Sequence, residues 1–355
     1  GPSGCDQSLR VHLVHGTILR HLNDRLWWVL LIAFVVRGGV LWFGQAALQD
    51  DPDAYARLAT NWARFGVMGV ESADGAQVSP SAFRPPLYPW LLSWLARPVS
   101  SDATAAPFQY SLPVLRVSGL HLIIGLLTVW LTWSIARDLR LRWPWLPALW
   151  VACDPILLRA SQLVMTETLA ACLVVVAWKL WLLVYPPIDI SRSENASSDD
   201  CRLPSAQSAR TLSGWLALAG LGVVWGLSIL ARPTAAPWVA ACVLGVVCFS
   251  SSCWKRRTND GLILSLLVAA CLAPWVLRNL SQFGKPIWAT THGGYTLLLA
   301  NNPLLYQHFA QHGPSRDWDA EPFHARWATR LDQVQTLSPD ELSFWSEPAP
   351  SATAI

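Results

Sequence analysis

Long apolar stretches, separated by shorter polar segments, dominate this sequence. An α-helix needs about 20 mostly apolar residues to cross a bilayer. Seven stretches approach or reach that length: residues 27–45, 114–136, 144–159, 162–185, 213–231, 235–252 and 261–277. The third is short and contains three prolines, so one interpretation is that it pairs with the fourth as a tight hairpin. The pattern predicts an all-α polytopic membrane protein.

The segment between the first two apolar stretches has a pattern of its own. Residues 54–65, AYARLATNWARF, place apolar side chains on one helical face, and Gly66 is a typical helix stop. Residues 86–96, PLYPWLLSWLA, repeat leucine and tryptophan at helical spacing, which is typical of a helix lying in the membrane interface. We expect residues 71–82 between them to form a loop.

The composition agrees with a membrane protein. The chain of 355 residues is 53% hydrophobic and only 14% charged, whereas soluble domains carry about a quarter charged residues. The net charge of +3 comes from scattered basic residues, which argues against a nucleic-acid partner. The eight cysteines include no CxxC pair, so a zinc site is not expected.

The distribution of positive charge predicts the orientation, because cytoplasmic segments are enriched in lysine and arginine. With the N-terminus in the cytoplasm, each inner segment carries three positive residues: Arg10, Arg20 and Arg25; Arg137, Arg140 and Arg142; Arg192, Arg202 and Arg210; Lys255, Arg256 and Arg257. The long outer segments contain no cysteine, as suits an oxidising compartment.

This orientation divides the chain into three parts. Residues 1–26 form a cytoplasmic N-terminus, and residues 27–277 form a membrane domain of about seven spanning helices. That domain includes an outer loop at 46–113 and an inner connector at 186–212. Residues 278–355 form an outer C-terminal segment, expected to be a small and truncated domain.

Three acids, Asp50, Asp51 and Asp53, follow the first apolar stretch directly. One interpretation is structural, because Asp53 precedes a predicted helix and could cap its N-terminus. The alternative is functional. Three neighbouring carboxylates repel one another, and such a cluster suggests that they serve a cation, a catalytic base, or both.

Other charged residues are expected on the same outer side. Arg84 precedes Pro85-Pro86, and it is either a snorkelling arginine or a phosphate ligand. Glu167 lies at the expected outer mouth of the fourth apolar stretch, either complementing a helix dipole or acting as a second acid. Arg232 and Arg278 flank the ends of later stretches.

Carboxylates and arginines together at the membrane surface suit transfer of a group from a lipid phosphate. A carboxylate can take the proton of an acceptor hydroxyl, and guanidinium groups can stabilise the departing phosphate. Arg37 and His121 lie within apolar stretches, and the buried Arg37 should have a partner or a wet cavity.

The order of these motifs resembles the GT-C membrane glycosyltransferases. The bacterial branch related to the protein O-mannosyltransferases and to the lipid A aminoarabinose transferase is the nearest in pattern. The resemblance runs over roughly residues 25–305, through DDPDAYARLATNWARFG, AFRPPLYPWLL, DPILLRASQLVMTETLAA, GLSILARP and APWVLRNLSQFG. It implies a GT-C-like helical bundle with interfacial helices in the first outer loop.

The resemblance also implies roles for individual residues. Asp53 maps to the catalytic base, with Asp51 as second choice, and Glu167 maps to the acid of the second outer turn. Arg84 maps to a donor-phosphate contact, and Arg232 is carried over to the same role.

We place Arg278 with these arginines because it is expected at the same outer mouth. Some relatives need a divalent metal and others do not. If Mg²⁺ or Mn²⁺ is present here, Asp51, Asp53 and Glu167 are the expected ligands.

The resemblance further implies an inverting hexosyl- or pentosyltransferase of EC class 2.4 in a bacterial inner membrane. The donor is a polyprenyl-phosphate sugar, and the acceptor is an envelope lipid, glycan or protein. Family members usually have more spanning helices, so one expectation is that this chain is a fragment or a truncated product. The sugar, the acceptor and the oligomeric state are left open.

Two other functions stay open at this point. A transporter or flippase would place ionisable residues near mid-membrane, and Arg37 and His121 fit that hypothesis. A structural subunit of an envelope complex would use the outer charges as a docking surface.

Overall fold

The computed structural model describes residues 25–51, 53–71, 77–99, 109–186, 210–249, 253–313, 318–323 and 325. These residues form two compact units. The first, here called the membrane unit, comprises Gly1–Asp50 and Pro113–Cys271. The second, here called the loop unit, comprises Asp51–Leu112 and Leu272–Ile355.

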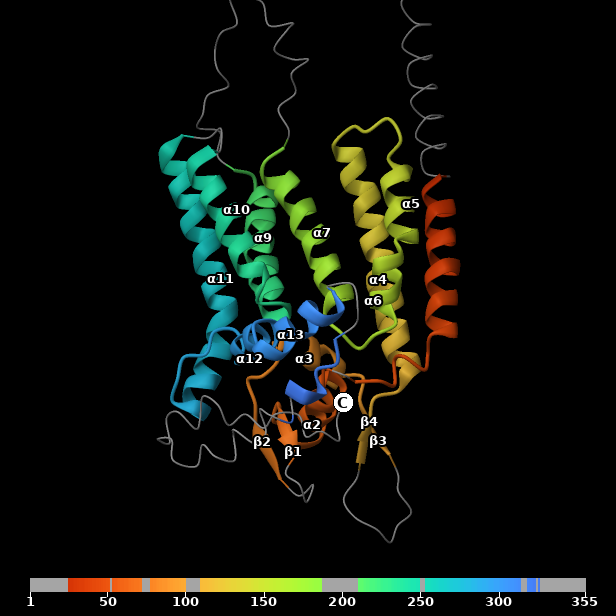
Figure 1. Cartoon of the computed structure of the whole chain (residues 1–355). Helices are drawn as coiled ribbons and strands as arrows, with labels where there is room; N and C mark the ends of the chain where they lie inside the picture. The colour runs from red at the N-terminus through yellow and green to blue at the C-terminus, as the bar shows by residue number, and fades with distance from the viewer. Residues whose placement is uncertain are drawn as a thin grey trace, which may run out of the picture. The chain divides into compact units, whose positions relative to one another are not determined.

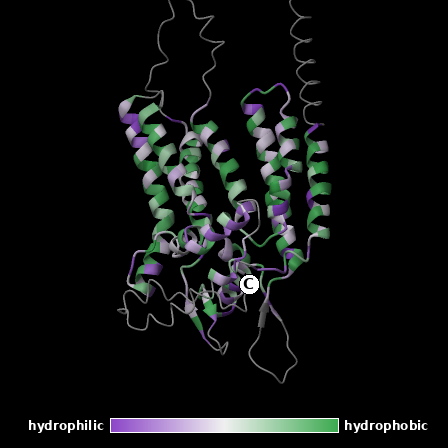
Figure 2. Cartoon of the chain, in the orientation of Figure 1, coloured by the Kyte–Doolittle hydropathy of each residue, from purple (hydrophilic) through white to green (hydrophobic). Residues whose placement is uncertain are grey.

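Helices make up the described part of the membrane unit (Figure 1). They are Arg25–Phe43, α4 (Val114–Asp138), α5 (Trp145–Cys153), α6 (Pro155–Ser161), α7 (Glu167–Val184), α9 (Leu212–Ala231), α10 (Ala235–Phe249) and α11 (Trp254–Phe283), which continues into the loop unit. Among the described residues, five helices are long and apolar enough to cross a membrane: Arg25–Phe43, α4, α7, α9 and α11. Figure 2 shows their hydrophobic character along most of their length. The chain is a multi-pass membrane protein.

The two remaining predicted spans form shorter helices. The stretch at 235–252 is α10, an apolar helix of 15 residues. The stretch at 144–159 is divided at Asp154, an extended residue, into α5 and α6. Most of the predicted connector at 186–212 lies outside the described residues, and so does nearly all of the predicted cytoplasmic N-terminus.

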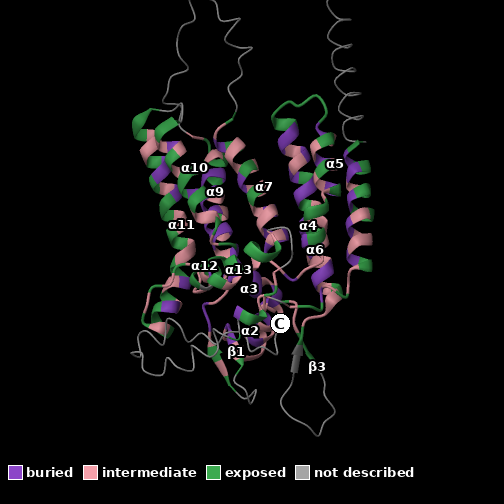
Figure 3. Cartoon of the chain, viewed as in Figure 1, coloured by how far each residue is buried: buried purple, intermediate pink, exposed green. Residues whose placement is uncertain are grey.

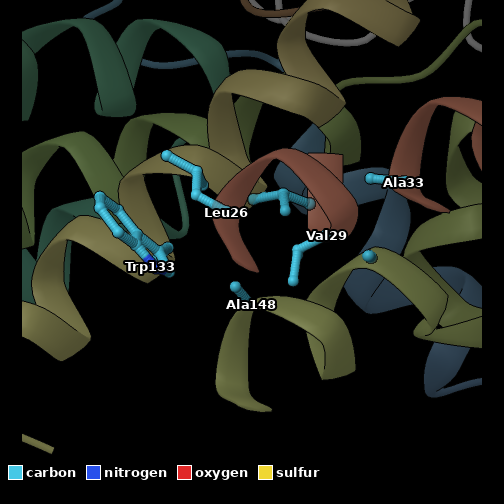
Figure 4. Close-up of a cluster of buried hydrophobic side chains, with 7 residues drawn as sticks. Leu26, Val29, Ala33, Trp133 and Ala148 are labelled. Atoms are coloured by element: carbon cyan, nitrogen blue, oxygen red, sulfur yellow. The ribbon is translucent and has the colours of Figure 1, made fainter. Parts of the chain in front are cut away.

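Small and large side chains interlock inside the membrane unit. Leu26, Val29 and Ala33 from the first helix pack against Trp133 of α4 and Ala148 of α5, as Figure 4 shows. α4 also packs on α7, and α7 on α9. The outward faces stay exposed (Figure 3), including large aromatic residues such as Trp42 and Phe43. An apolar exposed face suits contact with lipid, where burial against protein is not needed.

The break between α5 and α6 explains why Arg37 lies inside a spanning helix. In a continuous helix the carbonyl of Val151 would accept the N–H of residue 155, but Pro155 has none. The Nη2 of Arg37 donates to that carbonyl instead, at 2.7 Å. Arg37 is only 2% exposed, so its charged side chain supplies a donor that the backbone lacks.

His121 of α4 serves the end of α6 in a similar way. Its Nδ1 lies 2.7 Å from the carbonyl oxygen of Ser161, the last residue of α6. A carbonyl can only accept, so this nitrogen carries the proton. Both ionisable residues predicted within the membrane therefore satisfy carbonyls of a broken helix pair.

The loop unit combines short helices with two small antiparallel sheets that the sequence pattern did not predict. Its elements are α2 (Tyr55–Phe65), β1 (Gly69–Glu71), β2 (Val78–Pro80), α3 (Leu87–Ser93), β3 (Arg97–Val99), β4 (Gln109–Ser111), α12 (His292–Ala300) and α13 (Pro303–His312). β1 pairs with β2, placing Gly69 opposite Pro80, and β3 pairs with β4, placing Arg97 opposite Ser111. Part of the predicted loop at 71–82 is therefore strand β2.

The two helices predicted in this segment are present. α2 ends at Phe65 and is capped by Gly66, whose φ of +68° is the left-handed conformation that glycine adopts freely. α3 buries Tyr88 and Leu92, while Trp90 and Trp94 are 42% and 72% exposed. Exposed tryptophans on a short helix are typical of a membrane interface.

Candidate functional site

Asp51 caps the start of α2. Its Oδ1 accepts the N–H of Ala56 at 3.0 Å, and its Oδ2 accepts the N–H of Arg57 at 2.9 Å. The first N–H groups of a helix have no partner within the helix, so these bonds are capping interactions. Burial raises the pKa of Asp51 even though these bonds act in the opposite direction. The capping role considered for Asp53 therefore belongs to Asp51.

Asp53 forms an ion pair with a different residue, Arg84. The Nη2 of Arg84 donates to Asp53 Oδ1 at 2.5 Å, and its Nε donates to the backbone carbonyl of Asp53 at 3.0 Å. The side chains are 13% exposed for Arg84 and 24% for Asp53. The structure thus joins a candidate base and a candidate phosphate ligand that are 31 residues apart in sequence.

Aromatic rings hold the guanidinium of Arg84 in place. Its carbon lies 4.7 Å from the ring centre of Phe83 and 5.5 Å from that of Tyr55. Tyr55 in turn meets Tyr88 edge to face, with ring centres 5.4 Å apart. Such contacts attract a cation to the ring face, so Arg84 is fixed by packing as well as by its ion pair.

Arg278 supports the same segment from α11. Its Nη1 donates to the carbonyl of Ser81 at 3.0 Å and its Nη2 to the carbonyl of Met68 at 2.8 Å. The neighbouring Asn279 accepts a further bond from Arg278 and donates to the carbonyl of Ile287 at 2.8 Å. These bonds hold the segment that leads to Arg84. The phosphate-binding role expected for Arg278 stays a prediction.

His292, which was not among the site residues predicted from the sequence, lies close to Arg84. The N–H of Thr291 donates to the carbonyl of Ala82 at 3.1 Å. The ring of His292 then meets that of Phe83 edge to face, with centres 4.4 Å apart. The available signal was the string THGGY at 291–295, a titratable residue before two glycines after the last apolar stretch.

The membrane unit holds a second acid–arginine pair. Glu167 is in the first turn of α7, and Arg232 is the C-cap residue of α9. The Nη1 of Arg232 donates to Glu167 Oε1 at 2.8 Å. Each charge suits its helix end, because the dipole favours acids at N-termini and bases at C-termini. The second carboxylate oxygen of Glu167 has no hydrogen-bond partner among the described residues.

The predicted site residues therefore form three arrangements. Asp53 pairs with Arg84 and Glu167 with Arg232, while Asp51 and Arg278 bind mainly backbone groups. Over the described ranges, no group of three or more histidine, cysteine, aspartate or glutamate side chains is arranged to hold a metal ion. Asp51 and Asp53 belong to the loop unit and Glu167 to the membrane unit, so the conditional metal site stays a prediction.

Comparison with known proteins finds similarity in structure but not in sequence families. No protein-family model matches the chain, and no curated protein matches it either. Among solved structures, the chain is similar to the S. cerevisiae protein O-mannosyltransferase Pmt1-Pmt2 complex bound to the sugar donor, at 15% identity and a TM-score of 0.46. The match covers 74% of this chain and 34% of that chain, so this chain spans about a third of the yeast protein's length.

Proposed function

We propose that this protein is an inverting glycosyltransferase that moves a sugar from a polyprenyl-phosphate donor to an envelope acceptor. The acceptor is a lipid, glycan or protein at the outer face of a bacterial inner membrane. The single observation that carries the proposal is the ion pair of Asp53 with Arg84 in a chain with membrane-spanning helices. The sequence order of the surrounding motifs, which resembles the GT-C enzymes, supports the same reaction.

The two partners of this ion pair have complementary chemistry. Asp53 takes the proton of the acceptor hydroxyl. The electron pair left on the acceptor oxygen forms the new bond to the anomeric carbon of the sugar. The bond from that carbon to the phosphate oxygen breaks, and its electron pair leaves with the polyprenyl phosphate. Arg84 stabilises the charge that develops there, because a guanidinium matches phosphate oxygens well. Attack from the face opposite the leaving group inverts the anomeric centre.

The remaining residues take supporting roles in this proposal. Glu167 and Asp51 are supporting acids, and Arg232 and Arg278 are further contacts for the donor phosphate. A lipid-linked donor accounts for a reaction site on the segment that directly follows a spanning helix, Arg25–Phe43. The isoprenoid chain of such a donor remains in the bilayer while its phosphate reaches the surface.

The rival function of a transporter has lost its main support. It depended on Arg37 and His121 as ionisable residues within the membrane. Both donate to backbone carbonyls at the ends of the short helices α5 and α6, so a structural role accounts for them. No described contact favours the rival function of a docking subunit.

A transfer assay on purified protein in liposomes tests the proposal. The donors are polyprenyl-phosphate hexoses and pentoses, and the readout is release of free polyprenyl phosphate with envelope extract as acceptor. We expect turnover by the wild type and a loss of at least about a hundredfold in Asp53→Asn and in Arg84→Ala, as for removal of a catalytic base or charge stabiliser. Unchanged turnover in both variants would remove both assignments. Solute uptake without sugar transfer would favour the transporter.

A further inference from the structure

We propose that His292 is a ligand of the donor phosphate and binds it together with Arg84. This inference rests on the proposed function and adds a residue from the far end of the chain. His292 follows Arg84 by more than 200 positions in sequence. Both residues belong to the loop unit.

Backbone contacts fix the approach of His292 to Arg84. The N–H of Thr291 is bonded to the carbonyl of Ala82 at 3.1 Å. The residues on either side of this bond, Phe83 and His292, then bring their rings together at 4.4 Å between centres. Because Arg84 packs on the same Phe83 ring at 4.7 Å, imidazole and guanidinium share one aromatic neighbour.

The segment before His292 is also held at several points. Trp275 donates from its indole nitrogen to the carbonyl of Ala289 at 3.0 Å. Asn279, fully buried, donates to the carbonyl of Ile287 at 2.8 Å. A ligand for a charged group must be held within a fraction of an ångström, and these bonds supply that restraint.

Steric and electrostatic conditions near His292 suit an anion. Cβ atoms added to Gly293 and Gly294 would meet nothing within 4 Å, so the backbone after His292 is open to a bulky group. The charged group that acts on the imidazole is Arg84. Arg84 is paired with Asp53, and Arg278 donates to the backbone carbonyl of Ser81. Burial, with a smaller contribution from Arg84, lowers the pKa of His292 to about 4. The imidazole is therefore neutral at physiological pH and can donate one N–H to phosphate.

Proton linkage gives this ligand a measurable signature. An anion bound against the imidazole favours its charged form and raises its pKa. Donor affinity must then increase as the pH falls through the pKa that His292 has with the donor bound. It must level off near the pKa of His292 without the donor, about 4. A packed histidine that does not touch the donor gives no such increase.

The experiment measures binding of a polyprenyl-phosphoryl-hexose to the full chain in nanodiscs, between about pH 5 and 8. This phosphodiester keeps one charge over that range, so the probe itself does not titrate. The variants are His292→Ala, His292→Gln and the control His308→Gln. His308 is a histidine of the same unit that also lies beside an aromatic ring.

We expect His292→Ala to bind the donor about tenfold more weakly at neutral pH, as for loss of a hydrogen bond to a charged group. His292→Gln should retain most of the affinity but lose its rise at low pH, and His308→Gln should keep that rise. Equal affinity and equal pH dependence in all variants would overturn the inference, while leaving the proposed function intact. Absence of binding by the wild type, with thermal unfolding showing folded protein, would overturn the proposed function and this inference with it.

Discussion

The contacts of Asp51 and Asp53 assign one acid to helix capping and the other to the candidate catalytic pair, a division that the sequence could not predict. Asp50, Asp51 and Asp53 stand within four positions and have the same chemistry. Asp51 turns to the helix start and Asp53 to Arg84, and Ala54 between Asp53 and α2 adopts a left-handed φ of 60°. Such a backbone angle in alanine has no sequence signature. For this reason the set of candidates could be predicted, but their division into cap and base could not.

The pairing of Asp53 with Arg84 leads to a prediction about donor binding. In the described structure the carboxylate occupies the guanidinium, so a phosphate must compete with it for Nη2. Asp53→Asn removes the competing charge, and we expect it to bind the donor several-fold more tightly while transfer is lost. Equilibrium binding of a polyprenyl-phosphate sugar measures the first effect and turnover the second.

A matched control uses another partly exposed ion pair among the described residues, that of Asp138 with Lys179. Asp138→Asn breaks the pair with Lys179 and should change neither quantity. If Asp53→Asn instead weakens donor binding, the carboxylate contacts the donor or its metal directly, and competition for Arg84 is the wrong description.

Asp51 offers a prediction on stability that also tests its supporting role. Burial raises the pKa of Asp51 in the folded protein, so the folded state binds the proton more tightly than the unfolded state does. Stability from this group is therefore lost as the pH rises from the unfolded pKa through the folded one. Asp51→Asn keeps a capping oxygen without the buried charge, and we expect it to unfold at an equal or higher temperature at neutral pH.

Asp51→Ala removes the cap and should lower the unfolding free energy by about 1 kcal/mol. Thermal unfolding in detergent at two pH values compares the two variants. If Asp51→Asn is as unstable as Asp51→Ala, the cap depends on the charge. If Asp51→Asn is stable but inactive, Asp51 contributes to the reaction beyond its structural role.

At the scale of elements, the divided third apolar stretch shows what periodicity can and cannot predict. Its short length and its prolines suggested a tight hairpin with the fourth stretch, but no break within the stretch was predicted. The structure divides it at Asp154. The donor that repairs the break comes from Arg37, 114 residues away from Val151. Sequence showed that Arg37 needs a partner, but no local pattern identifies a backbone carbonyl as that partner.

This repair predicts coupling between Arg37 and Pro155. In the wild-type background, Arg37→Met leaves the carbonyl of Val151 buried without its donor, a loss of about 1–3 kcal/mol. In the Pro155→Ala background, the backbone N–H of residue 155 can replace the arginine, so the same substitution should cost less. Unfolding free energies of the four proteins form a double-mutant cycle, with an expected coupling of about 1 kcal/mol or more. Additive effects would show that the two residues act independently.

A buried acid of α11 binds residues that flank α7 and α9, and it gives a second prediction at this scale. Asp260 of α11 accepts two bonds from Arg210 at 2.9 Å and one from Tyr185 at 3.0 Å. Both charged side chains are almost fully buried. Removing one partner of a buried pair leaves an uncompensated charge, so Asp260→Ala should lower the unfolding free energy by about 3–5 kcal/mol.

Tyr185→Phe provides the graded comparison, because it deletes one neutral donor and leaves the ion pair. We expect it to cost about 1 kcal/mol. Equal effects of the two substitutions would mean that the ion pair contributes no more than the hydroxyl. Thermal unfolding of the purified variants in one detergent makes the comparison.

For the whole molecule, the sequence predicted the class of protein and most of its helices. Apolar length alone located Arg25–Phe43, α4, α7, α9 and α11, because a span must bury its backbone bonds within one helix. The sheets β1–β2 and β3–β4 escaped prediction, since three-residue strands are too short for an alternating pattern. His292 escaped for a different reason. Its importance depends on a contact with a segment that lies far away in sequence.

The orientation of the whole chain remains to be tested, and the cysteines make the test direct. The positive residues at 255–257 predict that Cys253 faces the cytoplasm. Ser281, an exposed residue beyond the same helix's apolar core, is predicted to face outward. In a variant with the other cysteines replaced by serine, a membrane-impermeant maleimide should label Ser281→Cys in right-side-out vesicles and Cys253 only in inverted ones. Labelling in the opposite sense would place Asp53 and Arg84 on the cytoplasmic face, where the donor would have to present its sugar to the cytoplasm.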